Sequence, residues 1–211
     1  MIFLSLIKNP YQQTSHFKNK LKWLVIFTLG NLLINIPFTF LLEFGEDTDL
    51  EDFINKLNLF QQFTLIAALP AIFEELIFRY PLRLKGFSIG IIFFAAIPIA
   101  IFSLLNLSQT AFYLCGFVLI IYMLLRKQIK LKLSNEKYST LVFYGISLLF
   151  AISHLDNFSN DPLITKVVLV FLALISAIFF GLIRIHIGFK HAILSHFFYN
   201  TTIVILSYVA P

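Results

Sequence analysis

Residues 63–82, FTLIAALPAIFEELIFRYPL, are the stretch that decides what kind of protein this chain is. A run of roughly 20 mainly apolar residues is long enough to cross the hydrocarbon core of a bilayer as an α-helix. The same run contains Glu74, Glu75 and Arg79. A charge at the centre of a spanning helix costs about 2.5–3.5 kcal/mol on insertion scales. The stretch therefore predicts a membrane helix whose charges are paired or functional.

The composition of the whole chain supports a membrane protein. Hydrophobic residues make up 59% and charged residues 13% of the 211 residues, whereas soluble domains average about 45–50% apolar and about 25% charged residues. An ordinary water-soluble globule is therefore excluded. The single cysteine, Cys115, excludes an internal disulfide and a cysteine-based zinc motif.

Apolar runs elsewhere predict further spanning helices. Helices are expected because an isolated strand would leave its backbone groups unpaired in lipid. We predict an all-α, polytopic transmembrane helical bundle of about seven spans, with a range of about five to eight. The N-terminal residues 1–22 are expected to form an interfacial segment, and 23–211 a single transmembrane domain. The predicted spans are 23–42, 63–82, 87–105, 110–125, 139–155, 163–185 and 191–209.

The distribution of charge predicts the orientation. Fourteen of the 16 basic residues fall in segments 1–22, 79–85, 126–137 and 184–190, which lie on one side in this topology. Lys and Arg mark the cytoplasmic side. The N-terminus is therefore expected in the cytoplasm, and the positive net charge next to anionic lipid requires no nucleic-acid partner. A bias toward Phe, Ile, Leu, Asn and Lys suggests a bacterium of low genomic GC, and hence its inner (cytoplasmic) membrane.

The charges within span 63–82 are candidates for a site. Glu75 and Arg79 are four residues apart, so they share one helix face and can form an ion pair. Glu74 is turned by about 100° from Glu75 and lacks an obvious local counter-ion, which suits it to proton transfer. A structural clamp of both glutamates on one arginine is the alternative. Pro70, one turn before Glu74, is expected to kink the helix or to be tolerated by packing.

Two further spans contribute polar side chains. His196 and Asn200 share a helix face, and such residues can carry protons and donate hydrogen bonds to a developing oxyanion. Their structural alternative is a hydrogen bond between helices. His154, four residues after Phe150, is a third candidate, although a lone histidine near the interface is more often a satisfied polar group. The predicted boundaries put His154 near the outer surface and His196 near the inner one. The two converge only if helices tilt, break or begin elsewhere.

Taken in order, these residues form three motifs: Glu74 to Arg79 matches EExxxR, Phe150 to His154 matches FxxxH, and His196 to Asn200 matches HxxxN. The ordered set resembles the CPBP family, the CAAX proteases and bacteriocin-processing enzymes related to type II CAAX prenyl endopeptidases. The resemblance covers about residues 63–205 and leaves out the first span. The interval from Arg79 to His154 is longer than this family leads us to expect, and we assign the excess to a hairpin over 87–125.

The resemblance implies a chemistry. Glu74 would activate water with help from His154, His196 and Asn200 would stabilise the oxyanion, and Glu75, Arg79 and Phe150 would support the site. It implies an intramembrane endopeptidase acting on a membrane-bound or lipidated peptide, of a CAAX or bacteriocin type, in the lipid bilayer. The cofactor is open: either none, which we favour, or zinc held by Glu74, His154 and His196.

Two other functions fit the same residues. A non-catalytic bacteriocin self-immunity or partner-binding membrane protein would keep the motifs without cleaving. A transporter would use Glu74 as a proton relay, although the sequence has no internal repeat of the kind found in many transporters.

Overall fold

The computed structural model describes residues 2–11, 19–41, 56–82, 136–155 and 162–209. These residues form helices and contain no strand, as predicted. Apart from the 59–82 segment, the helices are α1 (Ile2–Lys8), α2 (Lys20–Leu41), α8 (Glu136–Ile152), α9 (Leu163–His186) and α10 (Phe189–Val209). Residues 59–82 form one continuous helical path, called the site helix below. Its parts are α4 (Leu59–Gln62), the π-helix η2 (Phe63–Ala68), α5 (Leu69–Glu74), the π-helix η3 (Glu75–Arg79) and the 3₁₀ turn η4 (Tyr80–Leu82).

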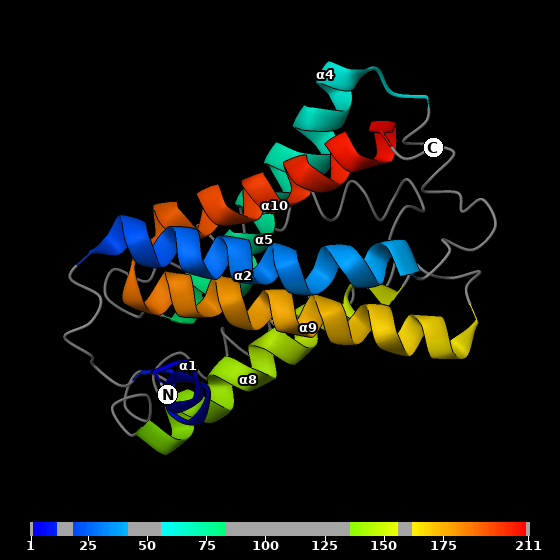
Figure 1. The fold of residues 1–211 in the computed structure, drawn as a ribbon. Coiled ribbons are helices and arrows are strands. Elements are labelled where there is room, and N and C mark those ends of the chain that lie inside the picture. Colours follow the sequence, from blue (N-terminus) through cyan, green and yellow to red (C-terminus); the bar gives the residue numbers. More distant parts are fainter. Residues whose placement is uncertain (1, 12–18, 42–55, 83–135, 156–161, 210–211) are drawn as a thin grey trace.

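The helices form a bundle around α9 and α10. In Figure 1, α2, α9 and α10 run side by side, while α8 lies obliquely against α9 and ends beneath its middle. The site helix packs against α10 through η2 and α5. The helices that carry the three predicted motifs therefore meet in the centre of the bundle.

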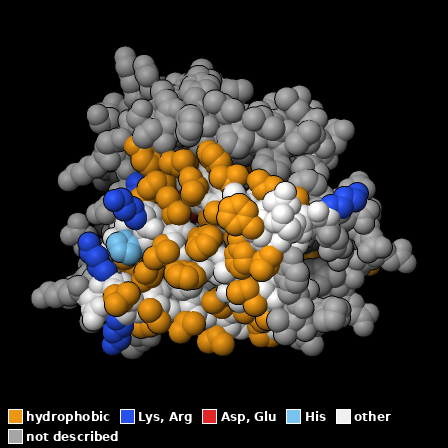
Figure 2. Space-filling view, turned by 90° about the horizontal axis from the view of Figure 1, so that it is seen from above, with side chains coloured by type: hydrophobic (Ala, Val, Ile, Leu, Met, Phe, Trp, Pro, Cys, Tyr) orange, Lys and Arg blue, Asp and Glu red, His pale blue; other side chains and the backbone are white. Residues whose placement is uncertain are grey.

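Two of the described helices are long and apolar enough to cross a membrane: Leu59–Arg79 and Leu163–His186. Figure 2 shows hydrophobic side chains across the middle of one face, with basic side chains at its two ends and most of them at one end. Exposed apolar side chains on α10, including Phe198 at 51% exposure, suit contact with lipid rather than water. Both observations support the predicted helical membrane protein. The predicted spans 87–105 and 110–125 lie outside the described residues, so the count of seven stays a prediction.

Two glycines allow the helices to pack as they do. A side chain at Gly181 on α9 would lie 2.6 Å from the Phe143 ring of α8, so only glycine permits this close approach. Gly188 has φ 141° and its N–H donates to Ile183 O, which ends α9 and lets α10 begin at the next residue. The positive φ is a conformation that glycine adopts without a steric penalty.

The N-terminal segment packs onto the end of the bundle. Leu6 is fully buried in the core, and the Tyr144 hydroxyl of α8 donates to the Ile7 carbonyl. The Tyr11 hydroxyl donates to the Leu82 carbonyl at 3.0 Å, at the end of the site helix. The segment predicted to lie at the membrane interface therefore also contacts α8 and the site helix.

Candidate functional site

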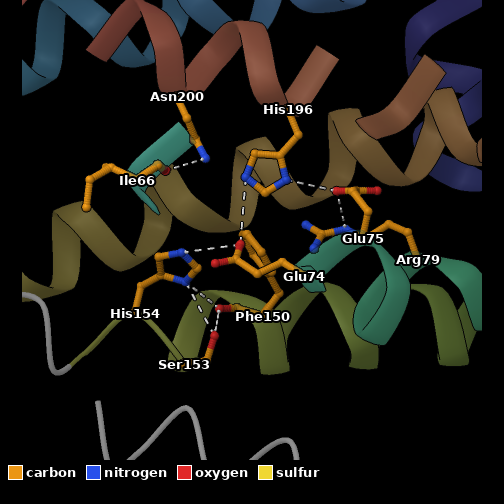
Figure 3. Close-up of polar contacts among 9 residues, drawn as sticks. All are labelled: Ile66, Glu74, Glu75, Arg79, Phe150, Ser153, His154, His196 and Asn200. Atoms are coloured by element: carbon orange, nitrogen blue, oxygen red, sulfur yellow. Dashed lines mark hydrogen bonds and ion pairs between the residues drawn. The ribbon is translucent and has the colours of Figure 1, made fainter. Parts of the chain in front are cut away.

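One residue from each of the other two predicted motifs converges on the Glu74 carboxylate. Its Oε2 atom lies 3.7 Å from His196 Nε2 and 4.0 Å from His154 Nε2 (Figure 3). The Glu74 and His154 side chains are 22% and 24% exposed, whereas His196 is 4% exposed. Glu74 and His154 are therefore partly exposed and His196 is buried, while the Glu74 Oε2 atom that faces both histidines is itself buried.

The tilt and the early end of α8 explain this convergence. The helix ends at Ile152, and His154 follows in a turn in which its N–H donates to Ala151 O at 3.2 Å. Because α8 is oblique and ends beneath the middle of α9 (Figure 1), the turn that follows it brings His154 Nε2 to within 4.0 Å of Glu74 Oε2. The expected separation of His154 from His196 was thus wrong, because sequence boundaries give a helix's length but not its tilt.

Hydrogen bonds at Nδ1 orient both imidazoles. His154 Nδ1 lies 2.8 Å from the Phe150 carbonyl, which can only accept, so this nitrogen carries a proton. His196 Nδ1 lies 3.1 Å from Glu75 Oε1, a carboxylate acceptor. In the neutral form of each ring, Nε2 is then left with its lone pair facing Glu74. The two histidines present equivalent atoms to one carboxylate oxygen.

A buried charged chain supports His196 from behind. Glu75 Oε1 also pairs with Arg79 Nε at 3.6 Å, and both side chains are at most 1% exposed. This is the i, i+4 pair predicted from the sequence, and within the described part of the chain no ion pair joins Arg79 to Glu74. The Arg79 guanidinium lies 3.7 Å from the Phe150 ring centroid, a cation–π contact. The sequence contains 26 phenylalanines, and among those that the structure describes Phe150 is the one whose ring covers the buried guanidinium of Arg79 at this distance.

Asn200 lies one turn beyond His196 but points elsewhere. Its Nδ2 donates to the Ile66 carbonyl at 3.4 Å (Figure 3). Pro70 has no N–H, so the Ile66 carbonyl four residues earlier lacks its α-helical donor. Asn200 partly replaces that donor. Its amide has two hydrogens, so one remains for another acceptor.

The zinc alternative can be tested on these distances. Ligands of a tetrahedral zinc ion with bonds of about 2.0–2.1 Å lie roughly 3.3 Å apart. The separations of 3.7 and 4.0 Å are longer, and no group of three His, Cys, Asp or Glu in the described part of the chain is arranged to hold a metal. Polar atoms this far apart instead suit a bridging water.

Sequence analysis missed two residues that shape the site. Phe180 of α9 stacks on the His196 ring, with centroids 4.5 Å apart and planes inclined by 17°. Arg184, also on α9 and buried, donates from Nε to the Arg79 carbonyl at 3.1 Å and from Nη2 to the Tyr80 carbonyl at 3.2 Å. The signal for Arg184 was available: it is a cation two residues before the end of a long apolar helix, where a loop charge was assumed.

The comparisons with known proteins returned no match: no family model, curated protein or solved structure is similar to this chain.

Proposed function

We propose that the protein is an intramembrane endopeptidase that hydrolyses a peptide bond with water activated by Glu74. The observation that carries the proposal is the convergence of Glu74 with the Nε2 atoms of His154 and His196 inside a membrane bundle. Ionisable residues are rare in spanning helices, and those that occur usually serve a function. Glu74, His154 and His196 come from three separate helices or helix ends and face one another. Together they supply a base and proton donors.

In the proposed reaction, a water molecule lies between the Glu74 carboxylate and the His154 imidazole. Glu74 takes one proton as the water oxygen attacks the carbonyl carbon, and the other hydrogen bonds to His154 Nε2. The proton on Glu74 then passes to the amide nitrogen as the C–N bond breaks. Glu74 is ionised again once this proton has left it, and the products are an amine and a carboxylic acid, which loses its remaining proton to become a carboxylate.

The oxyanion needs donors on the other side of the carbonyl. His196 Nε2 faces the site 3.7 Å from Glu74 Oε2, and it donates a hydrogen bond when the ring carries a second proton. The second amide hydrogen of Asn200 is a further donor once Ile66 is satisfied. Preorganised donors of this kind contribute about 10²–10³-fold to the rate in other hydrolases.

The proposed setting is a multi-pass protein of a bacterial inner membrane, with about seven spans and a cytoplasmic N-terminus. The described basic ends of the helices and the apolar belt support this orientation. The substrate is a membrane-associated or lipidated peptide, because a bond reaches a carboxylate within such a bundle most readily from the bilayer.

The test compares peptide termini in cells that carry the wild type or Glu74→Gln at matched membrane levels. Gln keeps the volume of the side chain and removes its charge, so the new termini should disappear. The control is Thr202→Ala, because Thr202 is half-buried on α10 and its hydroxyl donates to Phe198 O of its own helix. If Glu74→Gln keeps all the termini while the control behaves like wild type, the protein is not this protease, and a partner-binding role takes its place.

A further inference from the structure

A second polar cluster lies along α2, away from the three motifs. Thr28, Asn31 and Asn35 are spaced three and four residues apart, so they share one face of that helix. The two asparagines are at most 1% exposed. Asn35 Nδ2 donates to the Asn31 carbonyl at 2.9 Å and to Asn31 Oδ1 at 2.8 Å. Buried amides in a membrane helix are costly unless they bond, so this stripe has a purpose in the bundle.

The stripe ties α2 to both α9 and α10. Ser176 Oγ of α9 donates to Asn31 Oδ1 at 3.0 Å. The Thr28 and Ser195 hydroxyls of α2 and α10 lie 2.6 Å apart. Tyr199 of α10 completes the connection through a side-chain hydrogen bond to Ser176. These residues, called the α2 network, are Thr28, Asn31, Asn35, Ser176, Ser195 and Tyr199.

The α2 network contacts α10 on the face next to its site residues. Ser195 and Tyr199 are four residues apart and share one face, and His196 and Asn200 share the face about 100° further round. Rotation of α10 about its axis would move both pairs together. Holding Ser195 and Tyr199 therefore fixes the direction in which His196 points.

We propose that the α2 network is a positioning device that sets the rotation of α10, so that His196 Nδ1 meets Glu75 and Nε2 meets Glu74. The inference rests on the proposed function for its catalytic consequence, but the geometry it predicts can be measured without cleavage. Hydrogen bonds suit this task because they weaken steeply when misaligned. Apolar packing alone tolerates small rotations better.

One feature distinguishes the network from ordinary helix packing. Asn31 Nδ2 is buried and makes no hydrogen bond within the described part of the chain. Leucine would fill this place without an unsatisfied donor, so stability alone does not explain the asparagine. Its carbonyl oxygen, which accepts from both Ser176 and Asn35, is the atom that joins the helices.

The first experiment tests the contact itself. In a Cys115→Ser background, Thr28→Cys with Ser195→Cys should form a disulfide under mild oxidation, because the two oxygens that the sulfurs replace lie 2.6 Å apart. Leu29→Cys with Ser195→Cys is the matched control, since Leu29 is 52% exposed. Equal cross-linking of both pairs, or of neither, would overturn the proposed contact.

The second experiment tests the consequence by ¹⁵N NMR of His196 in detergent-solubilised protein. The wild type should show His196 protonated at Nδ1, whereas Thr28→Val with Asn31→Leu should give mixed tautomers. The single variant Thr28→Ser, which keeps the hydroxyl and leaves Asn31 in place, should give the wild-type signal. An unchanged tautomer in the folded double variant would overturn the proposal, whether or not the protein is a protease.

With a cleavage assay, the same variants separate positioning from folding. Thr28→Val should lower kcat about tenfold at unchanged KM, as expected for misplacement of a catalytic group by a fraction of an ångström. Its pH profile should shift, and Thr28→Ser should recover the rate. If KM rises and kcat holds, the network acts on substrate access and not on His196. If the wild type itself does not cleave, the proposed function fails while the tautomer result still stands.

Discussion

The site helix and α9 lie in the same bundle and are both long enough to span a membrane, yet they are built differently. α9 is one regular helix over Leu163–His186. The site helix changes from α to π geometry twice and contains Pro70, Glu74, Glu75 and Arg79. Single-turn π segments cluster at functional sites. We therefore expect α9 to support the bundle and the site helix to carry the proposed chemistry.

The largest effect should come from breaking the buried ion pair of the site helix. Arg79→Met leaves Glu75 charged and buried, and removing one partner of such a pair costs about 3–5 kcal/mol. We expect little folded protein in the membrane and a low thermal midpoint. Lys190→Met is the control, because Lys190 is an exposed cation at the start of α10. Equal midpoints for the two variants would contradict the importance of the pair.

On α9, the regular helix, a substitution should change stability through packing alone. Gly181→Ala places a methyl group 2.6 Å from the Phe143 ring, and overpacking of this kind costs about 1–3 kcal/mol. Gly145→Ala is matched to it, because an added Cβ there meets nothing within 4 Å. Alanine should stabilise that position by up to about 1 kcal/mol through helix propensity. Thermal unfolding of the two variants should therefore shift in opposite directions, and equal shifts would refute the close approach of α8 and α9.

Straightening the site helix should separate stability from activity. Pro70→Ala supplies an N–H for Ile66, so Asn200 loses its acceptor to a backbone donor. We expect unchanged or higher stability with cleavage lowered about tenfold, because a small misplacement is enough for such a loss. Pro37→Ala, at an exposed position near the C-terminal end of α2, should leave cleavage unchanged. Full activity in Pro70→Ala would mean that the irregular backbone has no part in the chemistry.

The smallest effect concerns the end of the site helix. Burial raises the pKa of the Tyr11 hydroxyl well above its ordinary value of 10.0. The neutral form is thus retained on folding, so this contribution to stability is present below pH 10 and falls as the pH rises above it. Tyr11→Phe removes the hydrogen bond to the Leu82 carbonyl, so it should lower the free energy of unfolding by about 1 kcal/mol at neutral pH. Above pH 10 its melting temperature should fall less than that of wild type, and parallel curves would contradict this.

Much of the fold followed from the pattern of apolar residues. The predicted spans 163–185 and 191–209 match α9 and α10 to within two residues, because long apolar runs in lipid have few alternatives to helix. The i, i+4 pair of Glu75 and Arg79 followed from helix periodicity alone.

The meeting of His154 with His196 did not follow from the sequence, because it depends on the tilt and early end of α8. Asn31 and Asn35 were missed although their spacing in a spanning run was visible. Amides that bond between helices carry no charge signal, and no motif marked these two.

The central claim is that Glu74 activates water for proteolysis. The most direct measurement compares purified wild type with Glu74→Gln. Both proteins are reconstituted in liposomes with membrane peptides that contain the cleavage sites found in the comparison of peptide termini. We predict cleavage by the wild type and a loss of at least about 10²-fold in Glu74→Gln, with both proteins unfolding at similar temperatures. Equal cleavage by two equally folded proteins would contradict the claim.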